Sequence, residues 1–234
     1  MFFSVIRTIM AGQPVDLWQV TAQVLAIVFV ILCILPLHEY AHGWVAGKLG
    51  DPTARLERRL TLNPLASVDP VGTVWLFLFG FGWAKPVPVD PRYFKKPKRD
   101  MAIVALAGPV SNLLAGLAGA VVMQAMRAFL TGGGVNAVTQ FIYAVLNFYV
   151  LVNIGLAAFN LLPIPPLDGS RILGAFLSDR ALATYYRYQN IFVMVMFMLL
   201  ISGVFSMPLA LVENAMSQAL FWLAGLPFRL FGVL

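Results

Sequence analysis

The sequence contains few charged residues for its length. Only 11% of its 234 residues are Asp, Glu, Lys or Arg, whereas about a quarter are charged in an average soluble domain. Hydrophobic residues make up 60% of the chain, and the mean hydropathy is +0.84. This composition excludes a soluble globular protein. It predicts an integral membrane protein, with room for a handful of spanning helices of about 20 residues each.

Cysteine and histidine are scarce as well, with one Cys and two His in the chain. The single cysteine, Cys33, excludes an internal disulfide and any cysteine-rich metal site. Cys33 precedes His38 by an offset that corresponds to about 140° around an α-helix. We therefore expect its thiol to point away from the histidines, as a small buried or lipid-facing side chain.

Acidic residues are outnumbered, which gives a formal net charge of +6. Ten of the sixteen Lys and Arg residues lie between Lys48 and Arg99. This clustering fits the positive-inside rule and anionic lipid head groups better than it fits the reading of bases. We therefore expect the lipid bilayer, and no nucleic acid, as a partner, with this basic connection on the cytoplasmic side.

Five apolar segments are expected to form helices, at about 17–49, 101–130, 137–162, 190–205 and 209–226. The last carries four polar residues, so whether it spans the membrane or lies at its surface stays open. Residues 1–12 are expected to form a retained interfacial or re-entrant helix. The predicted fold class is an all-α polytopic membrane protein with about five (four to six) transmembrane helices, in a single domain over 1–234.

The connection between the first two long segments is neither simply polar nor simply apolar. Residues 71–83 are too few and too rich in glycine for a spanning helix. Pro86-Val87-Pro88-Val89 favours extended backbone, because each proline disfavours the α region for the residue before it. Such backbone is tolerated at membrane depth only where it packs on protein or lines a watery cavity. We expect a small membrane-associated extended or hairpin segment here.

Both histidines lie in one string, His38-Glu39-Tyr40-Ala41-His42. Residues at i and i+4 share a helix face, so both imidazoles can reach one Zn²⁺ while Glu39 stands beside it as a general base. The apolar run 24–35 before the string carries no charge. Leu17 and His38 are separated by roughly 32 Å of helix. The pattern predicts a hydrolytic zinc site inside the membrane, toward the cytoplasmic face.

Two histidines do not complete a catalytic zinc site, which uses three protein ligands and an open position. With no other His and no second Cys, the third ligand must be a carboxylate. Glu39 is the base candidate, Glu213 lies in the doubtful last segment, and the other acids near the apolar segments fall at their borders. That leaves Asp168, which follows the proline-rich break after the third helix. Intramembrane ionisable residues indicate functional sites because burying them is costly.

The string HEYAH together with NLLPIPPLDG (residues 160–169) resembles the site-2 protease family of intramembrane zinc metalloproteases. Further strings agree and occur in the family's order: Asn63-Pro64, DPVG at 69–72, GWAKPVPV at 82–89 and AGPVSN at 107–112. The resemblance covers roughly residues 35–170. It is closest to the short bacterial and archaeal members that consist of the catalytic core alone, here about 17–175, without PDZ or CBS domains.

The resemblance implies a role for each residue of the two main motifs. His38, His42 and Asp168 would ligate one Zn²⁺ per chain. Glu39 would take a proton from the attacking water and pass it to the leaving amine. Asn160 matches an asparagine that is thought to hold the substrate backbone or the oxyanion.

The resemblance also implies the substrate, a peptide bond in or near a transmembrane segment of another membrane protein. A helix shields its own carbonyls, so the substrate must unwind locally before attack. The extended segment Pro86, Val87, Pro88 and Val89 could accept the unwound strand through backbone hydrogen bonds. Asn112 matches a position implicated in packing or substrate contact. The expected location is the cell (plasma or inner) membrane, as a multi-pass protein.

Two other function classes stay open beside the protease. A metal or proton transporter would also carry His, Glu and Asp inside the membrane, but transport gives no reason for a glutamate between paired histidines, and no inverted repeat is visible. A catalytically silent protein that binds membrane clients would typically have lost one catalytic residue, and none is missing here.

Overall fold

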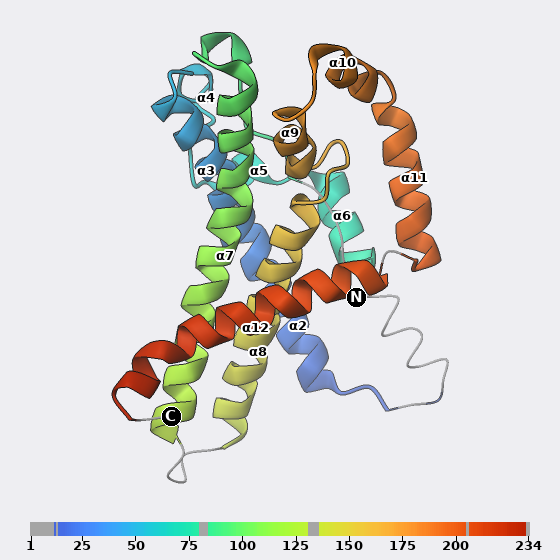
Figure 1. Cartoon of the computed structure of the whole chain (residues 1–234). Helices are drawn as coiled ribbons and strands as arrows, with labels where there is room; N and C mark the ends of the chain where they lie inside the picture. Colours follow the sequence, from blue (N-terminus) through green and yellow to red (C-terminus); the bar gives the residue numbers. More distant parts are fainter. Residues whose placement is uncertain (1–11, 13, 80–83, 131–135, 205, 233–234) are drawn as a thin grey trace.

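The computed structural model describes residues 12, 14–79, 84–130, 136–204 and 206–232, and over these ranges the chain is helical (Figure 1). The sheet-like contact in them is an isolated antiparallel bridge between Val68 and Ala84. The predicted all-α class is therefore confirmed. The interfacial helix expected at 1–12 falls almost entirely outside the described residues.

The first long helix is continuous but changes its pitch just before the histidines. It consists of α2 (Leu17–Phe29), a π-helical turn η1 (Val30–Ile34) and α3 (Leu35–Lys48). Within η1 the backbone hydrogen bonds join residues five apart instead of four, as in the bond from Leu35 N–H to Val30 O. Pro36 explains the wide turn: it has no N–H, and its ring would clash with the carbonyl one α-turn earlier. The π-helical turn therefore sets the rotation of α3.

The connection from 49 to 96 contains more helix than expected. It forms α4 (Thr53–Leu56), α5 (Pro64–Ser67), α6 (Pro70–Phe79) and a short 3₁₀ turn η2 (Pro91–Tyr93). Residues 70–79 are the helix α6, and Val68 pairs with Ala84 in an antiparallel bridge next to the hydrogen bond from Lys85 N–H to Ser67 O. The expected extended segment is present, because residues 85–90 have neither helix nor ladder.

Two long helices, α7 (Pro97–Leu130) and α8 (Ala137–Asn160), pack against each other and against α12 (Ser206–Leu230). Figure 1 shows α12 crossing both of them. Their shared core consists of buried small and apolar side chains from all three helices: Ala120, Met123, Val150, Ile154, Leu220 and Ala224. Helix α7 also packs along α3. Helix α7 is therefore the central element of the fold.

Three proline residues between 163 and 166 end the helical path of α8 and lead into α9 (Asp168–Gly174), α10 (Asp179–Arg187) and α11 (Gln189–Ser202). Lys98 Nζ lies 2.6 Å from Asp179 Oδ1 and ties α10 to α7. The hydrogen bond from Lys98 holds the pKa of the Asp179 carboxyl below its usual range. Helix α11 stands apart from α7 in Figure 1 and contacts α6 through Trp75 and Phe197.

Within the described ranges, four helices are long and apolar enough to cross a membrane: Val20–Lys48, Pro97–Ala128, Ala137–Asn160 and Met207–Leu230. This confirms a multi-pass protein within the expected range of four to six spans. The last helix has the length and composition of a span despite its polar residues. Helix α11 is apolar but shorter.

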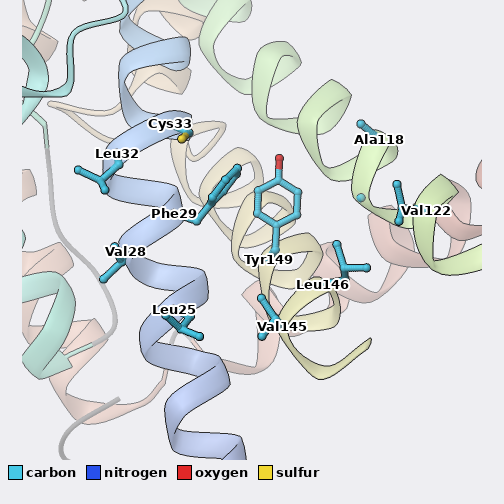
Figure 2. Close-up of a pocket in the computed structure, with 11 residues that line it drawn as sticks. Leu25, Val28, Phe29, Leu32, Cys33, Ala118, Val122, Val145, Leu146 and Tyr149 are labelled. Atoms are coloured by element: carbon cyan, nitrogen blue, oxygen red, sulfur yellow. The ribbon is translucent and has the colours of Figure 1, made fainter. Parts of the chain in front are cut away.

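An apolar cavity of about 570 Å³ opens between α2, α7 and α8. Figure 2 shows the rings of Phe29 and Tyr149 next to each other in its wall, in an edge-to-face contact with 5.3 Å between their centroids, and Cys33 at one end. Cys33 therefore lies in the wall of this cavity and is exposed, as expected for a thiol that points away from the histidines.

Close contact between α7 and α8 depends on Gly119. A Cβ atom there would lie 2.8 Å from Tyr149 Cδ1 and 2.9 Å from Val150 Cγ2. We predict that Gly119→Ala lowers the free energy of unfolding by about 1–3 kcal/mol, because the two helices must move apart. Thermal unfolding of the purified protein in detergent measures this loss.

Gly47→Ala is the matched control, since a Cβ at position 47 meets nothing within 4 Å. It should leave the melting temperature unchanged or raise it, because alanine favours the helix by about 0.5–1 kcal/mol over glycine. Equal melting temperatures for the two variants would contradict the packing argument.

Candidate metal centre

The structure brings His38, His42 and Asp168 together from two distant parts of the chain. Helix α3 places the imidazoles on one face, with 3.0 Å between their Nε2 atoms. Asp168 begins α9 and lies with Oδ2 3.3 Å from both Nε2 atoms. The side chains are buried, with relative exposures of 6%, 4% and 8%. Among the described residues this is the group of His, Cys, Asp and Glu side chains that could hold a metal ion.

The spacing of the three atoms fits a zinc ion. Ligand atoms about 2.0–2.1 Å from a tetrahedral zinc lie about 3.3–3.4 Å from one another. The observed separations of 3.0 and 3.3 Å come close to this triangle. Asp168 Oδ2 is buried and has no hydrogen-bond partner. A buried carboxylate oxygen without a donor is costly, and a cation between the three atoms would remove that cost.

Helix α7 fixes which nitrogen of each imidazole faces the centre. His38 Nδ1 lies 2.8 Å from Asn112 Oδ1, and His42 Nδ1 lies 2.7 Å from the Val104 carbonyl. Because both partners are acceptors, each Nδ1 carries the hydrogen and donates it, a tautomer inferred from the hydrogen-bond network. Both Nε2 atoms are then left with a lone pair. Three acceptor atoms thus converge on one point, which is the arrangement that a metal ion requires.

Gly108 gives the imidazoles the space they occupy. A Cβ atom at this position of α7 would overlap His38 Cε1 and His42 Nε2. Close approach of α7 to α3 at this level therefore requires glycine. The absence of a side chain at Gly108 thus leaves room for the two imidazole rings.

The three side chains line a cavity of about 140 Å³, which is separate from the apolar cavity of Figure 2, and Glu39 lines it as well. Glu39 Oε2 accepts a hydrogen bond of 2.7 Å from Val87 N–H. Pro86 and Val87 form one wall of the cavity, whereas Pro88 and Val89 do not line it. Of the expected extended segment, only the first half therefore reaches the site.

The two asparagines lie on different sides of the cavity. Asn160 is the last residue of α8, and its Nδ2 donates to Leu156 O in its own helix. Asn112 lies on α7 and is fully buried, with its oxygen on His38. Asn112 therefore orients the imidazole of His38, whereas Asn160 lines the cavity without contacting either histidine through a hydrogen bond.

Sequence reasoning missed Val104 and Arg171. Val104 contributes only its backbone carbonyl, for which no sequence signal exists. Arg171 lines the cavity, and it follows Asp168 by three residues, an offset that places two helical side chains on the same face. That offset would have predicted its position.

A substitution at Gly108 tests the fit of the metal directly. We predict that Gly108→Ala lowers the zinc content of the purified protein from one per chain to well below one, because the added methyl group occupies space that the ligand rings need. Metal analysis after gel filtration measures the ratio.

Gly116→Ala on the same helix is the control, because a Cβ there makes ordinary contacts of 3.4 Å. It should keep one zinc per chain. Full zinc content in Gly108→Ala would show that α7 does not limit the site.

The bond from His38 to Asn112 predicts a change in zinc affinity. Asn112→Ala should weaken zinc binding by about 10- to 100-fold, as is usual when the partner of a ligating histidine is lost. Asn112→Asp keeps an acceptor for His38 Nδ1 and should bind zinc more tightly than Asn112→Ala. Competition with a chromophoric chelator measures the three affinities. Unchanged affinity in Asn112→Ala, with slower substrate turnover, would instead favour a substrate contact.

Comparison with known proteins agrees with this geometry. The sequence model of peptidase family M50 matches residues 26–203. YwhC of Bacillus subtilis, provisionally named a zinc metalloprotease, is 42% identical over 150 residues, which are 63% of this chain and 67% of that protein. Rip2 of Mycobacterium tuberculosis, also provisionally named a zinc metalloprotease, is 31% identical over 195 residues, 80% of this chain and 70% of that protein.

An archaeal relative extends the comparison. Zinc metalloprotease MJ0392 of Methanocaldococcus jannaschii is 30% identical over 156 residues, 66% of this chain and 35% of that protein. No solved structure matches the chain. The family match covers both histidines and Asp168. The chain therefore belongs to peptidase family M50, the site-2 protease family of zinc metalloproteases.

Proposed function

We propose that the chain is a zinc-dependent intramembrane endopeptidase that hydrolyses peptide bonds in or near transmembrane segments of other membrane proteins. The observation that carries this proposal is the convergence of His38, His42 and Asp168 beside Glu39 in one cavity. Both histidines lie within the candidate span Val20–Lys48. Two of the three proposed zinc ligands and the proposed base, Glu39, therefore lie within a candidate membrane-spanning helix.

The distribution of charge supports a site toward the cytoplasmic side of the cell membrane. His42 lies six residues before Lys48, the last residue of α3. The basic connection that follows is rich in Lys and Arg, and such connections stay in the cytoplasm. The two histidines are therefore within about three helical turns of the cytoplasmic end of their span.

His38, His42 and Asp168 would hold the metal ion, and the cavity beside them has room for a water molecule or the substrate. When bound, zinc lowers the pKa of a water molecule and polarises the carbonyl of the scissile bond. The buried surroundings exclude most other water and strengthen the electrostatic interactions of the site.

Glu39 is the general base. Val87 N–H holds its Oε2, so the proton of the attacking water goes to the other oxygen, Oε1. Glu39 then returns this proton to the leaving amine nitrogen. The bond from Val87 fixes the direction of the carboxylate and links the base to the wall against which the substrate lies.

Pro86 and Val87 form the wall that faces the substrate, and Asn160 faces it from the end of α8. The amide of Asn160 donates to the substrate carbonyl by giving up its bond to Leu156 O. Asn112 acts on His38, and its contact with substrate is not needed. The extended, proline-rich backbone beside the zinc ligands suits an unwound substrate. Once the substrate has left the helical conformation, its backbone carbonyls can accept hydrogen bonds from the protein.

The substitution Glu39→Gln tests the mechanism. Purified protein in lipid vesicles should keep one zinc per chain but cleave a model transmembrane substrate at least about 100-fold more slowly, because only the general base is lost. Asp168→Ala should lose both zinc and cleavage. Zinc content and the rate of product formation are the two measurements.

Equal cleavage by wild type and Glu39→Gln would contradict the assigned base. Unchanged zinc affinity in Asp168→Ala would contradict the third ligand. Zinc flux into protein-containing vesicles, with no proteolysis by wild type, would favour the transporter instead.

A further inference from the structure

Arg59 binds backbone carbonyls in two separate segments of the chain. Its Nη1 donates to Ala66 O at 2.5 Å. Its Nη2 donates to Lys85 O at 2.9 Å and to Pro86 O at 3.1 Å. The guanidinium thus joins the end of α5 to the 84–90 segment, whose Pro86 and Val87 line the catalytic cavity.

The backbone turns sharply to bring Arg59 to this position. Arg58 has a φ of 54°, in the left-handed region that non-glycine residues seldom adopt. Arg59 N–H then returns to Ala54 O at 2.8 Å. The conformation is unfavourable by itself and persists because the surrounding contacts hold it. The Nε atom of Arg59 is buried and has no hydrogen-bond partner among the described residues.

Three side chains from the region of α3 and α4 hold the 84–90 segment in place. Besides Arg59, Glu39 accepts from Val87 N–H. Asp51, only 1% exposed, accepts from Asp90 N–H at 2.8 Å. Lys85 N–H donates to Ser67 O at 2.8 Å. Every one of these bonds is made to the backbone of the segment, so together they fix the path of its backbone.

The prolines explain why such support is needed. Pro86 and Pro88 have no N–H, so the segment cannot pair as a regular strand. Its carbonyls still require donors, because unpaired backbone groups are costly at membrane depth. Arginine can satisfy several carbonyls at once through its planar fork, whereas lysine offers a single flexible ammonium.

We propose that Arg59 is a positioning residue for proteolysis: by binding Lys85 O and Pro86 O it holds the cavity wall where the unwound substrate docks. This inference rests on the proposed protease function, in which Pro86 and Val87 face the substrate. Arg59 contacts neither the metal ligands nor the substrate. It acts through the 84–90 segment, and through Val87 on the direction of the Glu39 carboxylate.

A different role for Arg59 would be that of a plain positive charge on the cytoplasmic side of the membrane. Arg59 lies in the basic connection, where any cation supports the orientation of the helices. The two roles predict different outcomes for lysine. Arg59→Lys keeps the charge but loses the fork, so a topological role is rescued and a positioning role is not.

The experiment uses the full chain in lipid vesicles and compares Arg59→Lys and Arg59→Gln with wild type. Both variants should keep one zinc per chain while kcat/KM for a model transmembrane substrate falls by about 10- to 100-fold, as expected when docking is displaced by a fraction of an ångström or more. Arg55→Gln removes an exposed charge nearby and should stay within about twofold of wild type.

Cross-linking provides a readout of docking that is independent of turnover. With Lys85→Cys introduced in a Cys33→Ser background, a substrate with one cysteine near the scissile bond should cross-link to position 85. The yield should fall when Arg59→Lys or Arg59→Gln is added. Wild-type cleavage and cross-linking in Arg59→Lys would overturn the proposal, as would loss of zinc in both Arg59 variants or an equal loss of cleavage in Arg55→Gln.

Failure of the underlying function is distinguishable from failure of this inference. If wild type does not cleave, or Glu39→Gln cleaves equally, the protease proposal fails whatever the Arg59 variants do. If wild type cleaves and Glu39→Gln does not, but Arg59→Lys behaves as wild type, only the positioning role of Arg59 fails.

Discussion

Three buried acceptor atoms face one another at the centre of this protein, and the rest of the structure makes that arrangement possible. His38 Nε2, His42 Nε2 and Asp168 Oδ2 lie within 3.0–3.3 Å, and no donor lies between them. Without a cation, three desolvated lone pairs at this distance would destabilise the fold by several kcal/mol. With zinc bound, the same three atoms become ligands, so binding of the metal stabilises the folded chain.

Helix α7 positions the two imidazoles, although it contributes none of the three proposed ligands. Its Gly108 gives the imidazoles room, while Asn112 and the Val104 carbonyl fix their tautomers. Further along its length the same helix packs against α8 and α12. Rigid helices thus hold the proposed metal ligands, whereas irregular proline-rich backbone, held by side chains, forms the wall that we propose faces the substrate. This division suits a protease, because the ligands must not move and the substrate needs an extended surface.

The sequence was sufficient to predict that His38, His42 and Asp168 come together, but it did not predict which residues support them. Helical spacing brought His38 and His42 to one face, and the scarcity of other candidates left Asp168 as the third ligand. The support comes from tertiary packing: Asn112 lies 74 residues from His38 along the chain, and no local pattern pairs them. The hydrogen bonds from Arg59 to backbone carbonyls could not be predicted either. The basic residues of this connection predict the membrane topology, but they do not predict which carbonyls a guanidinium will bind. The sequence also did not predict that the apolar residues 71–79 form the helix α6.

The coordination of the bound metal tests the central claim most directly. X-ray absorption at the zinc edge, on the zinc-loaded protein, should show nitrogen and oxygen ligands at about 2.0–2.2 Å, with the multiple scattering of two imidazoles and no sulfur near 2.3 Å. The imidazole pattern should disappear when both histidines are replaced. A zinc–sulfur distance, a shell of six oxygens, or an unchanged spectrum in the double histidine variant would contradict a site built from His38, His42 and Asp168.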